Sequence, residues 1–183
     1  MKDFYRLMAR PVVVISTISP RGFPNAAPFS FSSPMASRPT PLFGFCCEVE
    51  HDTWRNVQQN GEFVVNLVGA EFGQLIEKLE THYPYEVSEI EKSGLTAMKA
   101  IKVKPPRIAE AYGWIECKMR ESLALSERSV WIIGEVQYSD AKDEYYNARE
   151  DVIDVGKAKT LNHIWGDVFT ITMTETHFKR ASR

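Results

Sequence analysis

Three consecutive residues, His51, Asp52 and Thr53, could together bind an anion. They precede residues 54–60, a stretch that predicts a short helix beginning at the Asp-Thr pair and stopped by Gly61. The backbone amides at a helix start carry partial positive charge and accept phosphate readily, and the Thr53 hydroxyl can add a hydrogen bond. The alternative is ordinary helix capping by Asp52 or Thr53.

A second candidate region, residues 27–31, could hold a flat ring. Its sequence Ala-Pro-Phe-Ser-Phe offers backbone amides and carbonyls beside a proline, a hydroxyl at Ser30, and aromatic side chains at Phe29 and Phe31. A planar ligand with a polar edge needs both kinds of contact. The alternative is a strand that ends in a turn, with both phenylalanines in the core.

The other reactive side chains do not form a convincing catalytic set. Cys46, Cys47 and Cys117 are the three cysteines, and none forms a CxxC pair or a metal-ligand spacing with the four histidines. Neighbouring Cys46 and Cys47 on one strand should point to opposite faces, and plain packing is the alternative to thiol chemistry. We expect no metal, and no Ser/His/Asp or Cys/His order suggests a triad.

The elements that must position these residues are mostly strands. The turn-rich residues 19–24 predict a hairpin, and residues 37–41 are too proline-rich to continue a strand. Neither GxGxxG nor GxxxxGK[ST] occurs, and about six strands with short helical pieces favour a closed or nearly closed antiparallel barrel over a parallel sheet. Strands are predicted at residues 12–18, 25–31, 42–47, 62–68, 113–119, 129–138 and 169–173, helical spacing at 70–79, a surface excursion at 82–94, and a helical or irregular stretch at 144–154.

Size and composition predict one globular domain over residues 1–183, because two cores would each be small. The net charge of −2 and the pI near 6.1 argue against a binder of nucleic acid. The apolar run at residues 12–15 is too short for a signal peptide or a membrane span. We therefore expect a cytoplasmic protein that binds neither nucleic acid nor membrane.

Several segments, taken in order, resemble the flavin reductase-like family with its FMN-binding split barrel. The resemblance covers nearly the whole chain and implies a mainly β fold, a split β-barrel of antiparallel Greek-key type, as a single domain of residues 1–183. The segments that carry it are residues 10–12, 22–31, 51–56 and 62–66, followed by 91–96, 103–108, 115–117 and 133–136.

The resemblance implies where FMN would bind. The isoalloxazine would lie against residues 27–31 and the phosphate against residues 51–53, where His51 stands in place of the family's usual lysine. Because histidine is only partly cationic near neutral pH, phosphate affinity should be weaker or more pH-sensitive than in relatives. Arg55 could reach the phosphate or be solvated, Asn66 is expected to be a buried support, and residues 161–167 should approach the flavin, often from a partner subunit. The predicted cofactor-binding residues are Asn25, Ala27, Pro28, Phe29, Ser30, Phe31, Cys46, Cys47, His51, Asp52, Thr53, Asn56, His163 and Trp165.

The activity implied is that of an NAD(P)H-dependent flavin oxidoreductase, in which bound flavin carries the chemistry and no side chain need be catalytic. Electrons would pass from NAD(P)H through FMN to a small-molecule acceptor, in a homodimer with the flavin at the interface. The first alternative is a non-enzymatic FMN-binding electron carrier. The second is a barrel that binds single-stranded nucleic acid, which the acidic pI disfavours. His82 and His177 are expected at the surface.

Overall fold

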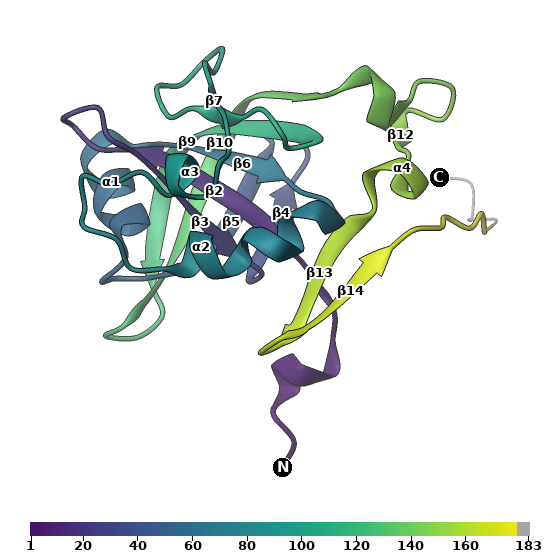
Figure 1. The fold of residues 1–183 in the computed structure, drawn as a ribbon, viewed down its shortest axis with the longest axis horizontal. Coiled ribbons are helices and arrows are strands. Elements are labelled where there is room, and N and C mark those ends of the chain that lie inside the picture. Colours follow the sequence, from purple (N-terminus) through teal and green to yellow (C-terminus); the bar gives the residue numbers. More distant parts are fainter. Residues whose placement is uncertain (179–183) are drawn as a thin grey trace.

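The computed structural model describes residues 1–178. Strands dominate, and the helices are short (Figure 1). The strands are β1 Arg10–Pro11, β2 Val13–Ile18, β3 Pro24–Phe29, β4 Ser32–Ala36, β5 Leu42–Glu48, β6 Glu62–Leu67, β7 Ala97–Met98, β8 Arg107–Ile108, β9 Gly113–Ala124, β10 Ser129–Ala141, β11 Tyr146–Asn147, β12 Val152–Ile153, β13 Thr160–Trp165 and β14 Val168–Thr172. The α-helices are α1 Asp52–Asn60, α2 Ile76–Glu80, α3 Glu89–Lys92 and α4 Val155–Ala158, and the 3-10 turns are η1 Phe4–Leu7, η2 Ala70–Leu75 and η3 Asp143–Tyr145.

The largest sheet has seven antiparallel strands in the order β3-β2-β6-β9-β10-β5-β4. Its two edge strands, β3 and β4, are consecutive in the chain, and only residues 30 and 31 separate them. A link of that length spans about 10 Å. The two edges must therefore lie close together, so the sheet curls into a barrel, as Figure 1 shows.

Both faces of the curled sheet are buried, because its strands carry apolar residues at adjacent positions. On β2, Val13 and Ile15 belong to one buried cluster, whereas Val14 belongs to another. The first cluster includes Phe45 and Phe63 and fills the barrel. The second lies outside it, beneath α2 and α3, which pack on the β3 side of the barrel (Figure 1).

Two of the predicted elements were wrong. The strand predicted over residues 25–31 stops at Phe29, and the residues after it form β4, which contains Pro34. An edge strand tolerates this proline because one side of its backbone has no pairing strand. The residues 144–154 contain the short strands β11 and β12, which pair with each other. The turn predicted at residues 19–24 is confirmed, and its Gly22 has a φ of +88°.

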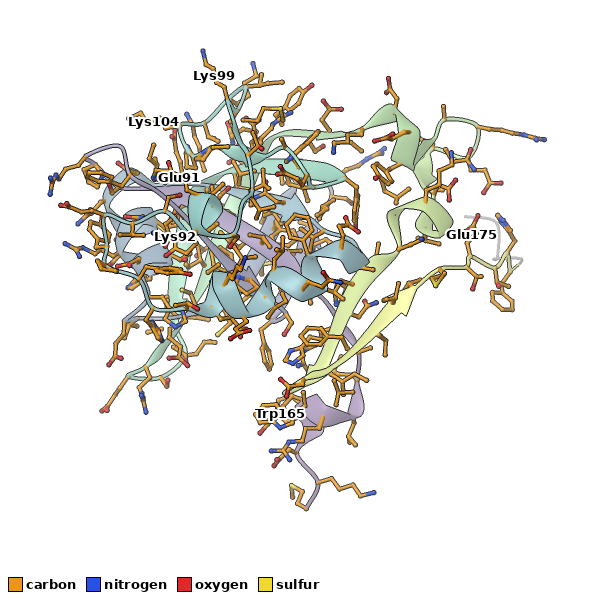
Figure 2. All side chains as sticks on the ribbon, in the orientation of Figure 1. Glu91, Lys92, Lys99, Lys104, Trp165 and Glu175 are labelled. Atoms are coloured by element: carbon orange, nitrogen blue, oxygen red, sulfur yellow. The ribbon has the colours of Figure 1, made fainter. Side chains whose placement is uncertain are left out.

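The strand β13 was not predicted from the sequence. It pairs with β1 on one side and β14 on the other, and the β13–β14 turn contains Gly166 at a φ of +51°. Its sequence Thr-Leu-Asn-His-Ile-Trp has little alternation of polar and apolar residues, so its pairing with β14 and with distant β1 determines its conformation. Figure 1 shows the β13–β14 hairpin extending beside η1, and Figure 2 shows Trp165 near its end.

No helix within residues 1–178 is both long enough and apolar enough to cross a bilayer.

Candidate cofactor site

The two candidate regions converge on one cavity of about 320 Å³. The end of β3 forms one side and the start of α1 another, and residues after α2 close a third. The volume lies at the lower end of the range for small-molecule sites. The cavity is lined by Asn25, Ala27, Pro28, Phe29, Glu50, His51, Asp52, Thr53, Leu79, Glu80, Thr81, His82, Tyr83 and Glu89.

The start of α1 faces this cavity without a side-chain cap. Its N-cap residue is His51, and neither Asp52 nor Thr53 caps the helix, so the capping expected for one of them does not form. One first-turn amide, that of Trp54, is directed to the sulfur of Cys47 beneath the helix. The helix ends as predicted at Gly61, whose N–H donates to the Val57 carbonyl at a φ of +68°. The first turn can therefore offer backbone N–H groups to an anion.

A network of buried polar side chains holds Thr53 in place. The amide nitrogen of Asn25 donates to the hydroxyls of Thr53 (3.1 Å) and Thr17 (3.2 Å), and Asn56 also donates to Thr17 (3.0 Å). Tyr85 donates to the Asn56 carbonyl oxygen (2.6 Å). Because the Thr53 oxygen accepts from Asn25, its own proton can be donated into the cavity.

The wall formed by β3 exposes one edge of its backbone. The N–H of Ala26 points away from β2 and donates to Glu89 (3.2 Å). Pro28 lies two residues further on and so faces the same way, where its missing N–H breaks no ladder bond. Phe29 is nearly buried and packs edge-to-face on Phe45 with 5.0 Å between ring centroids. The β3 edge thus provides an exposed carbonyl beside a fixed aromatic ring.

A second, smaller cavity of about 30 Å³ adjoins the first and contains His163 of β13. The Ser30 hydroxyl lies 3.3 Å from His163 Nδ1, and Nε2 lies 3.1 Å from the Gly166 carbonyl. A carbonyl only accepts, so Nε2 carries the proton and Ser30 donates to Nδ1. The two cavities share three lining residues and form a trough along β3. The lining of the smaller one is Val12, Pro28, Phe29, Ser30, Ile76, Glu80, His163 and Phe169.

Five of the predicted cofactor-binding residues line neither cavity. Phe31 and Trp165 are exposed near the N-terminal segment, where Tyr5 lies 5.1 Å from Trp165 and 6.5 Å from Phe31 between ring centroids. Asn56 donates to Thr17, which also accepts from Asn25, and Asn25 in turn donates to Thr53. The five are Phe31, Cys46, Cys47, Asn56 and Trp165.

The cysteines are poor nucleophiles here. Cys46 and Cys47 face opposite sides of β5, as predicted, since Cys47 is buried in the barrel and Cys46 is partly exposed. Burial raises the pKa of Cys47 to about 12 and that of Cys117 to about 12, and it also raises the pKa of Cys46. Their thiols therefore stay protonated at neutral pH and lack thiolate reactivity.

Carboxylates outnumber cations along the larger cavity. Burial raises the pKa of Asp52, and nearby Arg55, His51 and His82 oppose this rise. Burial also raises the pKa of Glu89, and the charge of Asp52 adds to the effect. Within residues 1–178, the ionisable cations of this lining are histidines, with no lysine or arginine among them; its carboxylates are those of Glu50, Asp52, Glu80 and Glu89.

These residues fit a flavin nucleotide at three places and oppose it at one. The uncapped start of α1 and the Thr53 hydroxyl suit a phosphate, the β3 edge suits a polar ring edge, and Phe29 supplies an apolar surface. The acidic lining opposes a phosphate unless a cation is added. Within residues 1–178, His51 and His82 are the residues of this lining that can supply such a cation.

The wall that follows α2 was missed in the sequence. His82 is exposed, as predicted, yet it lines the larger cavity together with residues 79–83 and Glu89. Nothing in the local pattern links these residues to the start of α1, about 30 residues earlier. The density of histidine, tyrosine and glutamate in an irregular stretch was the available signal, because functional side chains concentrate in such loops.

The chain belongs to the flavin reductase-like family, since residues 4–152 match the family described as "Flavin reductase like domain". It is 32% identical to an uncharacterized protein of Methanothermobacter thermautotrophicus over 91% of this chain and 81% of that protein. The matched family region ends before β13, so His163 and the hairpin lie beyond it.

Solved structures share the fold. A flavin reductase with a split barrel domain from Shewanella frigidimarina superimposes with a TM-score of 0.86, at 21% identity, over 94% of this chain and 87% of the other. Component B of nitrilotriacetate monooxygenase from Bacillus cereus gives 0.85, at 24% identity, over 94% and 88%. The predicted mainly antiparallel split barrel and family membership are thus confirmed.

Proposed function

We propose that this protein binds FMN in the trough along β3 and works as an NAD(P)H-dependent flavin oxidoreductase. The proposal rests on one observation: the β3 end and the α1 start line the same cavity, although about 25 residues separate them in the chain. When bound, the flavin supplies the redox chemistry by taking a hydride from reduced nicotinamide and passing electrons to an acceptor.

The residues of the chain bind and orient. The α1 amides and the Thr53 hydroxyl hold the phosphate, while Asn25 keeps the Thr53 oxygen in place. The β3 backbone near Pro28 and the hydroxyl of Ser30 meet the polar ring edge. His163 fixes the Ser30 hydroxyl from β13. None of these groups needs to transfer a proton, which agrees with the absence of a triad in the sequence.

Two measurements test the proposal. Denaturing the pure protein should release a yellow compound with the mass and fluorescence of FMN. When NADH or NADPH is added to the holoprotein in air, the reduced nicotinamide should be oxidised. A colourless protein that takes up no added FMN would overturn the proposal. Bound FMN without NAD(P)H oxidation would instead identify an electron carrier, the alternative that the sequence leaves open.

We also propose a homodimer that completes the flavin site. The aromatic side chains of Phe4, Tyr5, Phe31 and Trp165 form a chain of ring contacts on the N-terminal side, and three of them are largely exposed. Exposed apolar groups that adjoin one another commonly mark an interface. Ser30 and His163, close in sequence to this patch, would then lie near the partner. Sedimentation of the FMN-loaded protein as a monomer at micromolar concentration would contradict this.

The proposed compartment is the cytoplasm. The three cysteines are all unpaired thiols, as expected where disulfides do not persist. Fractionation of cells that express the full chain would test this assignment.

A further inference from the structure

His82 is held against the larger cavity from both sides of the loop that carries it. Before it, Leu79 of α2 is buried in the outer core. After it, Tyr85 donates to Asn56 and lies beneath the guanidinium of Arg55, 3.8 Å from the ring centroid, so it is attached to α1. His82 is therefore an exposed side chain on a fixed backbone, directed to the same space as the α1 start.

His51 faces His82 across the first turn of α1. Their ring centroids are 6.5 Å apart, and both rings are close enough to Asp52 to lower its pKa against the effect of burial. His51 also lies 3.9 Å from Glu48, between Nε2 and Oε2. The two imidazoles thus border the one place in the cavity where helix amides are directed outward.

A phosphate ester bound there would meet several carboxylates. Two negative charges a few ångströms apart repel strongly in a partly buried site. Among residues 1–178, Arg55 is the arginine whose charge acts on Asp52 in the first turn of α1. Its guanidinium lies over the Tyr85 ring and does not line the cavity. The charged or titratable groups around the two histidines are Glu48, Glu50, Asp52, Arg55, Glu80, Tyr83, Tyr85 and Glu89.

We infer that His51 and His82 together form a two-histidine clamp for the flavin phosphate, with His82 as a phosphate-binding residue on the wall opposite α1. The clamp rests on the proposed function, because it names the contact for the phosphate of that same flavin nucleotide. The two imidazolium groups supply positive charge that offsets the repulsion between the phosphate and the carboxylates of the lining. Riboflavin has the same ring and ribityl chain without the phosphate, so the clamp does not act on it.

The clamp links FMN binding to proton uptake. A histidine that gains an anionic partner becomes harder to deprotonate, so binding of FMN near neutral pH should be accompanied by proton uptake. The affinity for FMN then declines as the pH rises from about 6.5 toward 8, where an ordinary histidine loses its charge. The phosphate monoester titrates near pH 6, so the dianion is already the main form over most of this window.

The experiment is a titration of the flavin-stripped full chain with FMN and with riboflavin, followed by flavin fluorescence at pH 6, 7 and 8. FMN affinity should fall by about tenfold or more between pH 6 and pH 8, whereas riboflavin affinity should change less than about twofold. Calorimetry at pH 7 in two buffers of different ionisation enthalpy should show net proton uptake for FMN alone.

Variants separate the two histidines. His82→Gln should weaken FMN binding at pH 6 by about tenfold and reduce the pH dependence, since one charge-assisted hydrogen bond is lost. His51→Lys should restore affinity at pH 8, because lysine keeps its charge there. His177→Gln is the matched control, since His177 is an exposed histidine whose ion contact is with Glu150.

Each outcome has one meaning. FMN affinity that is independent of pH, or unchanged in His82→Gln, would overturn the clamp while leaving the proposed function intact. Equal affinity for FMN and riboflavin would overturn the clamp together with the proposed phosphate contacts of α1 and Thr53, while leaving flavin binding along β3 intact. Failure of both flavins to bind the wild-type chain would overturn the proposed function, and the clamp with it. Because His82 is exposed, its substitution should leave the unfolding temperature close to that of the wild type.

Discussion

The protein buries carboxylates in two places, and these differ in whether a cationic side chain neutralises the carboxylate. Glu116 of β9 is fully buried, and it accepts from the backbone N–H groups of Ile101 and Lys102 and from Arg107 Nε (2.7 Å). Arg107 Nη2 adds an ion contact at 2.6 Å. Glu89, at the larger cavity, is almost as buried but accepts from the backbone, including the N–H of Ala26, and has no ion-pair partner within residues 1–178.

This difference between Glu116 and Glu89 distinguishes a carboxylate that stabilises the fold from one that lies at a ligand-binding cavity. Glu116 and Arg107 neutralise each other, and Arg107 also lies about 5 Å from the ring centroids of Trp114 and Tyr138, so this pair has little charge left to offer a ligand. Among residues 1–178, the carboxylates that line the larger cavity have no lysine or arginine beside them in that lining. A site with unmet charge is costly to fold but ready to bind, and it gains most when a ligand supplies the missing contacts.

The largest effect on the free energy of unfolding is expected from removing the buried ion pair between Glu116 and Arg107. Glu116→Gln leaves the Arg107 guanidinium buried without its counterion, which should lower the free energy of unfolding by about 3 to 5 kcal/mol. Denaturant unfolding of the wild type and the variant gives this difference. A loss below about 1 kcal/mol would mean that the pair is not the main support of this end.

The next effect concerns the site itself. Thr53→Ala removes one hydrogen bond to a charged group and should weaken FMN binding by roughly 1 to 2 kcal/mol. Flavin titration measures this loss, and Thr53→Ser, which retains the hydroxyl, should recover most of it. Unchanged FMN affinity in the alanine variant would remove Thr53 from the site.

A smaller effect follows from removing an uncompensated charge. Glu89→Gln takes away one carboxylate near the phosphate position and should tighten FMN binding by about 1 kcal/mol. Weaker binding of FMN by the glutamine variant would show that the carboxylate helps to hold the ligand.

Glu89→Gln should also change how the free energy of unfolding depends on pH. Because burial raises the pKa of Glu89 in the folded state, its stabilising contribution is present below its ordinary pKa and is lost as the pH rises through the raised value. Glu89→Gln should therefore lessen the loss of stability above about pH 4.5. Unfolding curves between pH 4 and pH 7 measure this, and an identical slope in both proteins would contradict it.

The smallest effect is the control for the first prediction. Lys118 lies on β9, the strand that carries Glu116, and forms an ion pair at 3.8 Å with Glu62 of β6, but the Lys118 side chain is 53% exposed. Solvent screens such a pair, so Lys118→Gln should change the free energy of unfolding by less than about 1 kcal/mol. A loss as large as that of Glu116→Gln would show that burial does not explain the contrast.

The sequence predicts α1 and, apart from β4, the barrel strands, because local chemistry dictates them. The β-branched run in β2 and the glycine that ends α1 are strong local signals, and the order of segments identified the family. The strand β13 escaped because its residues do not alternate and its conformation depends on pairing with β14 and with β1, which lies about 150 positions away. His82 escaped for the same reason: a cavity wall is a property of the folded chain, and the loop that carries His82 has no periodic pattern.

The two-residue junction between β3 and β4 joins opposite edges of the sheet, and Ser30 is one of those two residues. Ring closure and ligand contact therefore depend on the same short piece of backbone. Lengthening it would let the curled sheet open and would displace the Ser30 hydroxyl from His163 at the same time. Anyone redesigning this protein for a larger substrate should graft new loops elsewhere, for example into the exposed turn between β9 and β10 at residues 125–128, which lines neither cavity.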